Sequence, residues 1–390
     1  MTLRAHWLLA GLVLGSLVTN CQCACQNNPH GDGDTGAPAD AARDGVVEDA
    51  VVWALDAWVP RDACDATKIL LPPTGDTVVG QVSNMARYVA YDNRIAPETI
   101  KRGEVFLYDL ETCFEYQLTD RDWDQGFPFL WGNEVVFRDY VDEQSLNAQL
   151  VSFDISTLTF SVLEGGDPAT HVVHNGRHLV YQRYTDVIGA VELTLWDRQN
   201  GQKRMLAEAA QGAETLSISA THAAWVAWGG PGKDVFYVEL ETMEVHHVGS
   251  TAFPTVYNTT TWGDYVLWDD DRYGLSEVMA LRISTGQEWR LSDGTWRATR
   301  PKLRGHIVCM LTVDYSPGEG VDLMLYDMET GVRRRVTTEA RYGYKSGYVD
   351  SGWLVYQEEK YPGDIWRNKI WALNLLKLGI VDADGHVVPE

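Results

Sequence analysis

The sequence has few basic residues and, beyond its first 18 positions, no long apolar run. Lys and Arg number 32 against 55 Asp and Glu, which gives a formal net charge of -23. With no basic stripe in the chain, a phosphate backbone would be repelled, so nucleic acid is excluded as a partner. No later stretch approaches the length of apolar sequence that spans a bilayer, so we expect no transmembrane helix in the mature chain.

Common catalytic and nucleotide-binding motifs are missing as well. There is no G-x-S-x-G elbow, no H-E-x-x-H helix and no G-x-x-x-x-G-K-[ST] loop; the pair Gly232-Lys233 is followed by Asp234 where a phosphate loop needs Ser or Thr. We therefore expect no cofactor, and the sequence favours a protein without enzyme activity.

The chain opens with the pattern of an export signal. Arg4 precedes an apolar run from Trp7 to Val18, and Cys21 follows shortly after. The order Val-Thr-Asn-Cys resembles a bacterial lipoprotein signal, although Asn20 stands where a small residue is usual. We predict acylation of Cys21 and a place at the outer membrane or cell surface, with release into the periplasm or the medium as the alternative.

The composition divides the chain into four parts. Residues 1–20 are the signal, and 21–65 are a linker, since positions 26–50 are small, polar and rich in Gly, Asp and Ala. From about 66 to 381 short alternating runs of apolar and polar residues are punctuated by Gly, Asn, Asp and Pro, which is typical of antiparallel strands. Residues 382–390 form a C-terminal tail.

A six-residue unit, first written Leu107-Tyr108-Asp109-Leu110-Glu111-Thr112, returns at near-constant intervals. Its third position recurs at 109, 154, 197, 239, 282, 327 and 374. Such a period indicates stacked supersecondary units. Each unit adds an upstream apolar strand, turn pairs such as Gly132-Asn133 and an outer strand, so we predict an all-β, seven-bladed β-propeller of four-stranded antiparallel blades, with six or eight blades as alternatives.

Closure of the ring is predicted to use the N-terminus. The segment from Thr67 to Leu71 has the pattern of an outer strand but precedes the first blade, and the last unit has a poor outer strand of its own. Pairing the two would remove an open sheet edge. It would also bring Cys64 and Cys113 to one rim, where we predict a disulfide because an exported protein permits one, while Cys309, inside an apolar strand, is expected to be a buried thiol.

The turn from Asp270 to Val278, which reads DDRYGLSEV, resembles the S-D-R-x-G-x-x-[DE]-[IV] turn of TolB-type repeats, also called PD40-type. Arg94 after Asp92-Asn93 and the Tyr-Asp-Leu-Glu-Thr style of the recurring unit are similar to the same repeats. The resemblance implies a propeller of the prokaryotic cell envelope. Seven units differ from the six blades usual in TolB itself, so no Tol-system role is carried over.

Candidate binding residues fall in the predicted loops between blades, where propellers commonly bind ligands. Exposed aromatic and charged residues there suit protein or carbohydrate recognition, because a ring supplies apolar area and a charge orients polar groups. The alternative is that the aromatics space the blades. The candidates are Asp122, Trp123, Asp124, Trp296, Arg297, Arg300, Arg341, Tyr342 and Tyr344. His171 and His174 are weak candidates for a metal site near the channel, and no third ligand is identifiable.

The sequence thus favours an exported, envelope-associated and non-catalytic propeller that binds an envelope protein or glycan through its loop face. Two alternatives stay open: a polysaccharide lyase or hydrolase with a metal in the channel, and a purely structural envelope protein. We expect a monomer that touches a membrane only through the predicted lipid. Fold analogy alone cannot name the ligand.

Overall fold

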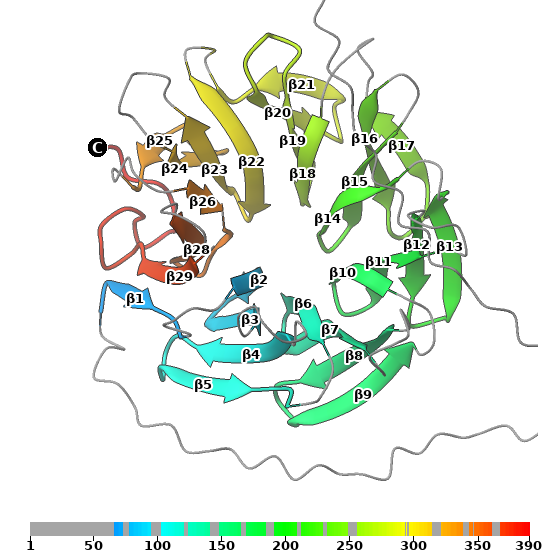
Figure 1. Ribbon diagram of the computed structural model, residues 1–390. Helices are drawn as coiled ribbons and strands as arrows, with labels where there is room; N and C mark the ends of the chain where they lie inside the picture. The colour runs from blue at the N-terminus through cyan, green and yellow to red at the C-terminus, as the bar shows by residue number, and fades with distance from the viewer. Residues whose placement is uncertain are drawn as a thin grey trace, which may run out of the picture. The chain divides into compact units, whose positions relative to one another are not determined.

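Seven antiparallel sheets stand around a central channel in the computed structural model (Figure 1). The structure describes residues 66–72, 78–94, 103–120, 124–140, 148–164, 169–184, 191–208, 212–228, 232–248, 256–292, 294, 296–313, 321–337, 343–345, 347–360 and 367–390. All of these belong to one compact unit, Ala54–Glu390. They form strands and turns without a helix, and none of them lies in a helix that could span a membrane. The predicted seven-bladed β-propeller is confirmed.

The first four blades follow the chain from the innermost strand outward. Blade 1 comprises β2 (Val78–Met85), β3 (Tyr88–Arg94), β4 (Gly103–Asp109) and β5 (Phe114–Gln117). Blade 2 comprises β6 (Gln125–Trp131), β7 (Glu134–Tyr140), β8 (Ala148–Asp154) and β9 (Thr159–Glu164). Blade 3 comprises β10 (Ala169–His174), β11 (His178–Tyr184), β12 (Val191–Asp197) and β13 (Gln202–Ala207). Blade 4 comprises β14 (Glu214–Ile218), β15 (His222–Trp228), β16 (Lys233–Glu239) and β17 (Val245–Val248).

The remaining blades keep this order until the last. Blade 5 comprises β18 (Val256–Trp262), β19 (Tyr265–Asp270), β20 (Glu277–Arg282) and β21 (Gln287–Arg290). Blade 6 comprises β22 (Arg297–Arg304), β23 (Ile307–Val313), β24 (Val321–Asp327) and β25 (Arg333–Arg335). Blade 7 comprises β26 (Gly343–Lys345), β27 (Val349–Asp350), β28 (Trp353–Lys360), β29 (Arg367–Asn374) and, from the N-terminal side, β1 (Lys68–Leu70).

The ring closes as predicted, through the strand from the N-terminal side. β1 pairs antiparallel with β29, with Ile69 opposite Ala372, and in Figure 1 the blue β1 lies beside the red β29. It therefore supplies the outer strand that blade 7 lacks. A strand edge left unpaired there would be open to association with other chains, so this closure protects the seam between the first and last blades.

The two faces of the ring are defined by the strand order. Hairpins between first and second strands, and between third and fourth strands, lie at one face, which we call the turn face. Connections between second and third strands, and from each blade to the next, lie at the other, which we call the loop face. The recurring hexapeptide marks the third strand and its turn, as Asp109, Asp154, Asp197 and Asp327 end β4, β8, β12 and β24.

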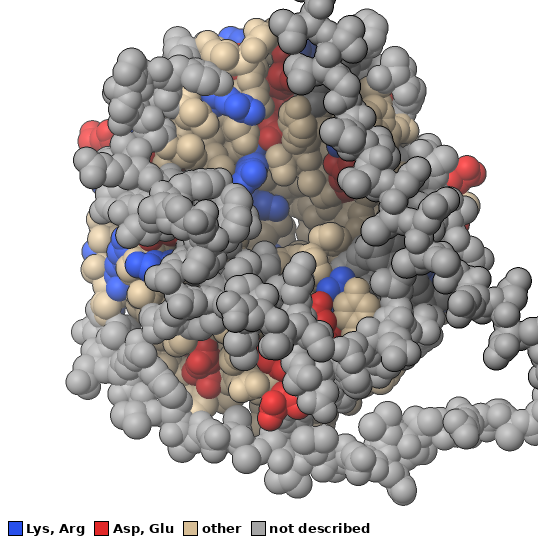
Figure 2. All heavy atoms as spheres, viewed as in Figure 1, with Lys and Arg blue, Asp and Glu red and all other residues tan. Residues whose placement is uncertain are grey.

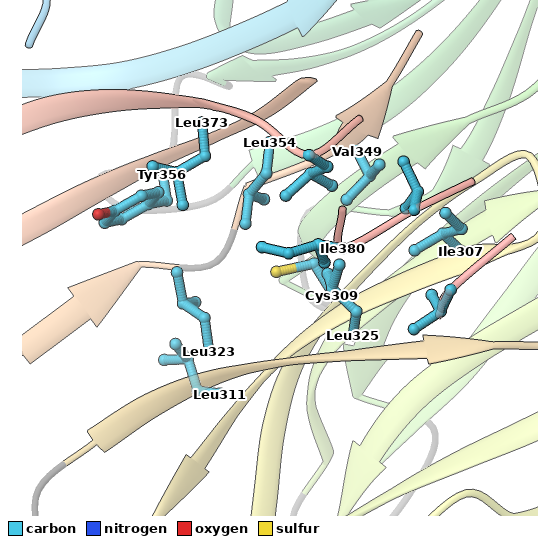
Figure 3. Packing of buried hydrophobic residues seen from close by; sticks show 13 residues of the cluster. Ile307, Cys309, Leu311, Leu323, Leu325, Val349, Leu354, Tyr356, Leu373 and Ile380 are labelled. Atoms are coloured by element: carbon cyan, nitrogen blue, oxygen red, sulfur yellow. The ribbon is translucent and has the colours of Figure 1, made fainter. Parts of the chain in front are cut away.

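Apolar clusters lie between neighbouring blades, and every pair of neighbours in the ring has one. The second strand of each blade is buried on both faces, which explains why it is apolar without alternation; β23 reads IVCMLTV and is buried in its first six residues. Figure 3 shows the cluster between blades 6 and 7, where Cys309 lies among Leu325, Leu354 and Ile380. Cys309 is a free, fully buried thiol, and burial raises its pKa to about 12.

The other cysteine that the structure describes is Cys113, in the turn between β4 and β5, and it is buried and disulfide-bonded. Its partner lies outside the described residues, and so does Cys64. The pairing of Cys64 with Cys113 therefore stays a prediction. Cys21, the predicted lipid site, also lies outside the described residues.

Candidate functional site: the central channel

A cavity of about 570 Å³ lies in the central channel, walled by the inner strands of several blades. Its polar lining includes Gln81, His171, Glu214, Asn258, Arg300 and Lys302. This volume falls in the range of about 300 to 1,000 Å³ typical of small-ligand sites. The residues come from five different blades, so the propeller alone brings them together.

β-bulges turn these side chains toward the channel. In blades 1 to 6 the register between the first (innermost) strand and the second strand shifts by one residue. The shift occurs at the same place in each blade, within the half of the innermost strand nearer the loop face. Gln81, His171, Asn258 and Arg300 all stand at such a shift. A bulge adds an unpaired residue and re-aims its side chain. Arg300 accordingly adopts a left-handed backbone with φ of 53°.

Two buried aspartates hold the bulges in place, and they occupy the same position of their blades. Asp269 in β19 accepts hydrogen bonds from the backbone N–H groups of Tyr257 (3.2 Å), Asn258 (2.6 Å) and, in the next blade, Arg300 (3.1 Å). Each carboxylate thus joins its own blade to the following one. Charge-assisted bonds of this kind are stronger than those between neutral groups.

Asp92 in β3 accepts the equivalent hydrogen bonds in blade 1. It accepts from the backbone N–H of Gln81 and from that of Phe127 in the next blade, the latter at 3.3 Å. The carboxylate lies so close to Gly126 that a Cβ there would come 2.7 Å from Asp92 Oδ2. Glycine at 126 is therefore required by this contact and not by backbone angle.

The channel narrows toward the turn face. Trp131 of blade 2 and Trp262 of blade 5 meet there with ring centroids 5.4 Å apart. The Arg304 guanidinium lies over Trp262 at 5.4 Å, donates to the Asn84 carbonyl of blade 1 and pairs with Asp350 Oδ2 at 3.1 Å. Because this constriction is formed at the ends of the inner strands, the cavity lies on its loop-face side.

Positive charge follows one inner strand through the channel. β22 carries Arg297, Arg300, Lys302 and Arg304 and no acidic residue. Figure 2 shows Lys and Arg side chains along the position of this strand, running from the rim toward the centre of the ring. In a chain of net charge -23 this is a local reversal of sign, and the absence of a basic stripe that was inferred from the sequence is wrong for this strand. Charge of one sign in a low-dielectric cleft concentrates ligands of the opposite sign.

The predicted binding residues are only partly brought together. Arg300 lines the cavity, and Arg297 begins the same strand; both had been expected in a loop, but β22 already begins at Arg297. Trp296 packs half-buried against the cluster between blades 5 and 6. The backbone of Tyr344 lies in β26, again a strand and not a loop. Asp122, Trp123, Arg341 and Tyr342 lie outside the described residues.

Asp124 and His171 are linked by a row of contacts at the channel wall. Asp124 Oδ2 pairs with Arg138 Nη2 at 3.2 Å, and the Arg138 guanidinium lies 4.5 Å from the Phe127 ring. Phe127 meets His171 edge to face, with centroids 4.5 Å apart, and His171 Nδ1 bonds Gln182 Oε1 at 2.9 Å. Desolvation at the channel wall lowers the pKa of His171.

The two histidines proposed as metal ligands are held apart by their hydrogen bonds. His174 is fully buried; its Nε2 donates to the Phe129 carbonyl at 3.0 Å, and its Nδ1 accepts from the Gly176 N–H at 3.3 Å. Burial lowers its pKa to about 4. Within the described part of the chain, neither His171 nor His174 belongs to a group of three side chains close enough to share an ion.

Several site residues escaped the sequence reasoning although a signal was present. Trp131, Trp262 and Arg304 each end an inner strand just before the glycine of its turn, the same repeat position in three blades. Residues at one repeat position converge near the axis of a propeller. Lys302 could have been found from the basic run of β22, where Arg297, Arg300, Lys302 and Arg304 are separated by neutral residues.

No protein-family model and no curated protein matches the chain. Solved structures do. Acylaminoacyl peptidase of Pyrococcus horikoshii aligns at 13% identity and a TM-score of 0.56, covering 77% of this chain and 52% of that one. The β-propeller domain of the trilobed protease from Pyrococcus furiosus aligns at 12% identity and a TM-score of 0.55, covering 77% of this chain and 95% of that one.

The likeness is one of fold. This chain spans about half the length of the peptidase it matches. TolB from Acinetobacter baumannii also aligns, at 12% identity and a TM-score of 0.42, covering 74% of this chain and 80% of that one. At such identities a shared propeller says nothing of a shared ligand or reaction, because the same fold serves many functions.

Proposed function

We propose that this chain is an exported, non-catalytic binding protein whose channel receives an anionic group of an envelope protein or glycan from the loop face. The observation that carries the proposal is the basic strand β22 along a cavity of about 570 Å³ in a strongly acidic protein. Arg300 and Lys302 supply charge in the cavity, while Gln81 and Asn258 supply amide groups for orientation. Carboxylates suit this set, since guanidinium and ammonium groups bind them through charge-assisted hydrogen bonds.

The place of the protein in the cell forms part of the same proposal. Three sequence motifs support this cellular location: the export-signal pattern, the Cys21 pattern and the TolB-type turn of blade 5. A monomer anchored by acyl chains on Cys21 would present the propeller at a membrane surface through the linker that follows. Mass measurement of the mature chain would show the added acyl mass, and an unmodified N-terminus at Cys21 would contradict the anchor.

The binding proposal is tested with two defined anionic probes. Titration calorimetry would compare hexagalacturonate and hexaglutamate with an uncharged cello-oligosaccharide and with hexalysine. We expect an anionic probe to bind, and the uncharged and basic probes to fail. The double variant Arg300→Gln, Lys302→Gln should weaken binding by about tenfold or more for each charge removed, because each anchors a desolvated carboxylate.

A matched control removes two positive charges elsewhere. Lys203→Gln, Lys377→Gln changes exposed residues of β13 and of the turn after β29 and should leave the affinity unchanged. If neither anionic probe binds, or if both double variants weaken binding equally, the channel proposal is wrong. Preference for hexagalacturonate over hexaglutamate would point to a glycan, and the reverse to an acidic peptide.

A further inference from the structure

The turn face carries a side-chain cluster that the channel proposal does not use. After β29 the chain folds back: Val381 bridges Val387, and the Val388 N–H donates to the Ile380 carbonyl at 2.9 Å. Val381 and Val387 are buried in the cluster between blades 6 and 7. This packing fixes the C-terminal segment on blade 6 and sets His386, beside Val387, over the end of β24.

Three ligand-type side chains meet at that point. Asp327 ends β24 and is fully buried; its Oδ2 lies 3.0 Å from His386 Nδ1 and 4.0 Å from His306 Nε2. The three ligand atoms all lie within 4.8 Å of one another, and the two imidazole rings are 4.6 Å apart at their centroids. Among the residues that the structure describes, no other group of His, Cys, Asp and Glu meets this condition.

The carboxylate is oriented before any ion arrives. Asp327 Oδ1 accepts the backbone N–H groups of Glu329 at 2.9 Å and Thr330 at 3.1 Å. Its Oδ2 accepts the Val387 N–H at 3.2 Å and faces the histidines. Groups that fix a ligand's direction in this way raise metal affinity, and their loss typically costs about 10- to 100-fold.

Comparison with other blades shows what is different here. In blades 1 and 3 the equivalent carboxylates meet an arginine from the neighbouring turn: Arg87 Nη2 to Asp109 Oδ2 at 3.2 Å, and Arg177 Nη2 to Asp197 Oδ2 at 2.7 Å. In blade 6 the same turn position carries His306. The arginine of those blades is thus replaced by the imidazole of His306, and the C-terminal segment adds a second imidazole, that of His386.

We propose that His306, Asp327 and His386 bind a divalent transition-metal ion, Zn²⁺ by preference. Two imidazole nitrogens and one carboxylate oxygen form a ligand set typical of zinc, whereas Ca²⁺ and Mg²⁺ prefer oxygen ligands alone. Tetrahedral zinc with bonds of about 2.0 to 2.1 Å places its donor atoms about 3.3 Å apart. The histidine side chains are 24% and 31% exposed, so they can move to this spacing.

A metal bound here would have an open position toward solvent. His306 and Gly385 also line a cavity of about 280 Å³ at the turn face, together with Arg304 and Asp350. Three protein ligands leave the fourth place of a tetrahedral ion to water or to an incoming ligand atom. The ion would also tie the C-terminal segment to blade 6 by bonds stronger than the present hydrogen bond between His386 and Asp327.

The experiment measures metal on the full mature chain. Purified protein is stripped with chelator, loaded with ZnSO₄ and desalted, and bound zinc is counted by mass spectrometry; competition with a chromophoric chelator gives the affinity. We expect one tightly held zinc per chain. His306→Ala and His386→Ala should each weaken it by about 100-fold or more, because each removes one of three ligands.

The variants also separate metal binding from simple packing. His306→Ala keeps the hydrogen bond between His386 and Asp327 and loses only the one from His306 Nε2 to the Gly385 carbonyl at 3.2 Å, so its metal-free melting temperature should lie slightly below that of the metal-free parent. Zinc should raise the melting temperature of the parent but not of this variant, since only a folded state with all ligands binds the ion. His246→Ala, His247→Ala, on the outer strand β17, controls for adventitious binding by the half-exposed His246 and the exposed His247.

Two results would overturn the proposal. Loss of all zinc on desalting of the parent would show that the cluster is only a hydrogen-bonded contact of the C-terminal segment. Equal zinc affinity in the parent and His306→Ala would place any bound ion elsewhere. If His386→Ala fails to fold, His306→Ala decides the question alone.

Discussion

The turn face and the channel wall use their polar residues differently. At the turn face, the carboxylates that end the third strands repeat one arrangement. Asp109 accepts the N–H of Glu111 at 3.0 Å, Asp154 that of Ser156 at 2.8 Å, and Asp327 that of Glu329 at 2.9 Å. Each bond is local, between a residue and its neighbour two places on, so this turn forms where an aspartate holds the third position of the hexapeptide.

In the channel wall one repeat position holds five different residue types in the seven blades. The fifth residue of the second strand reads, from blade 1 to blade 7, Asp92, Arg138, Gln182, Val226, Asp269, Leu311 and Gln357. Asp92 and Asp269 join neighbouring blades through bulge amides, Arg138 pairs with Asp124, and Gln182 bonds His171. Repetition therefore builds the scaffold, and variation at equivalent positions builds the site.

The largest effect is expected where a varied residue serves two blades. Asp269→Ala would leave the partly buried N–H groups of Tyr257, Asn258 and Arg300 without their acceptor. We expect a loss of about 4 kcal/mol in the free energy of unfolding, since each orphaned donor costs about 1 to 3 kcal/mol. Urea unfolding measures it. Asp269→Asn, which keeps the shape and one acceptor oxygen, should lose less; equal losses would mean that the charge and the second oxygen, not the shape, provide the stabilisation.

A second comparison concerns the neutral histidine between blades 2 and 3. Burial lowers the pKa of His174 to about 4, against about 6.5 in an unfolded chain. Between these values the unfolded chain binds a proton that the folded chain does not, so stability falls as the pH drops from about 6.5 to about 4. The full change is about 3 kcal/mol.

Unfolding free energies at pH 7 and pH 4.5 would test this. In His174→Gln, whose amide can still donate to the Phe129 carbonyl, that share of the pH dependence should disappear. His247→Gln, on the outer strand, should keep the dependence of the parent. An unchanged pH dependence in His174→Gln would show that His174 is not the group responsible.

The smallest effect is expected at the repeated turn. Asp109→Ala removes the acceptor of the Glu111 N–H and the partner of Arg87, whose side chain is 40% exposed. Solvent screens that ion pair, so we expect a loss of about 1 kcal/mol, in the range of a single turn or cap bond. Thermal unfolding of this variant beside Asp269→Ala gives the comparison directly. A loss at Asp109 as large as that at Asp269 would contradict the distinction between scaffold and site.

Much of the fold could be predicted from the sequence because its signals are local. The spacing of Asp109, Asp154 and Asp327 gave the blades, and the apolar segment around Ile69 gave the closing strand. Boundaries were less certain: Arg300 and Tyr344 lie in inner strands, not in loops. Inner strands are interrupted by bulges, which hides their alternation from a reading of the sequence.

The site was less predictable because its residues are distant in the chain. Arg300 and Asp124 were predicted as site residues because they are charged and were expected in exposed loops. The roles of Lys302, Asp269 and the ring pair Trp131 and Trp262 can be recognised only from their contacts across the channel. The turn-face cluster shows the same limit. His386 lies 59 residues from Asp327, and only the folding back of the C-terminal segment brings them to 3.0 Å.

The sequence by itself determined the period, the number of blades, the third-strand turns and the closing strand, because each depends on neighbours in the chain or on a repeated pattern. The tertiary structure decided which unlike residues of the seven blades face one another. A ring places equivalent positions at one radius and one height, so a basic strand in blade 6 and amides in blades 1 and 5 come to share one cavity. No local sequence pattern predicts that these residues share a cavity, because they come together only once the ring is closed.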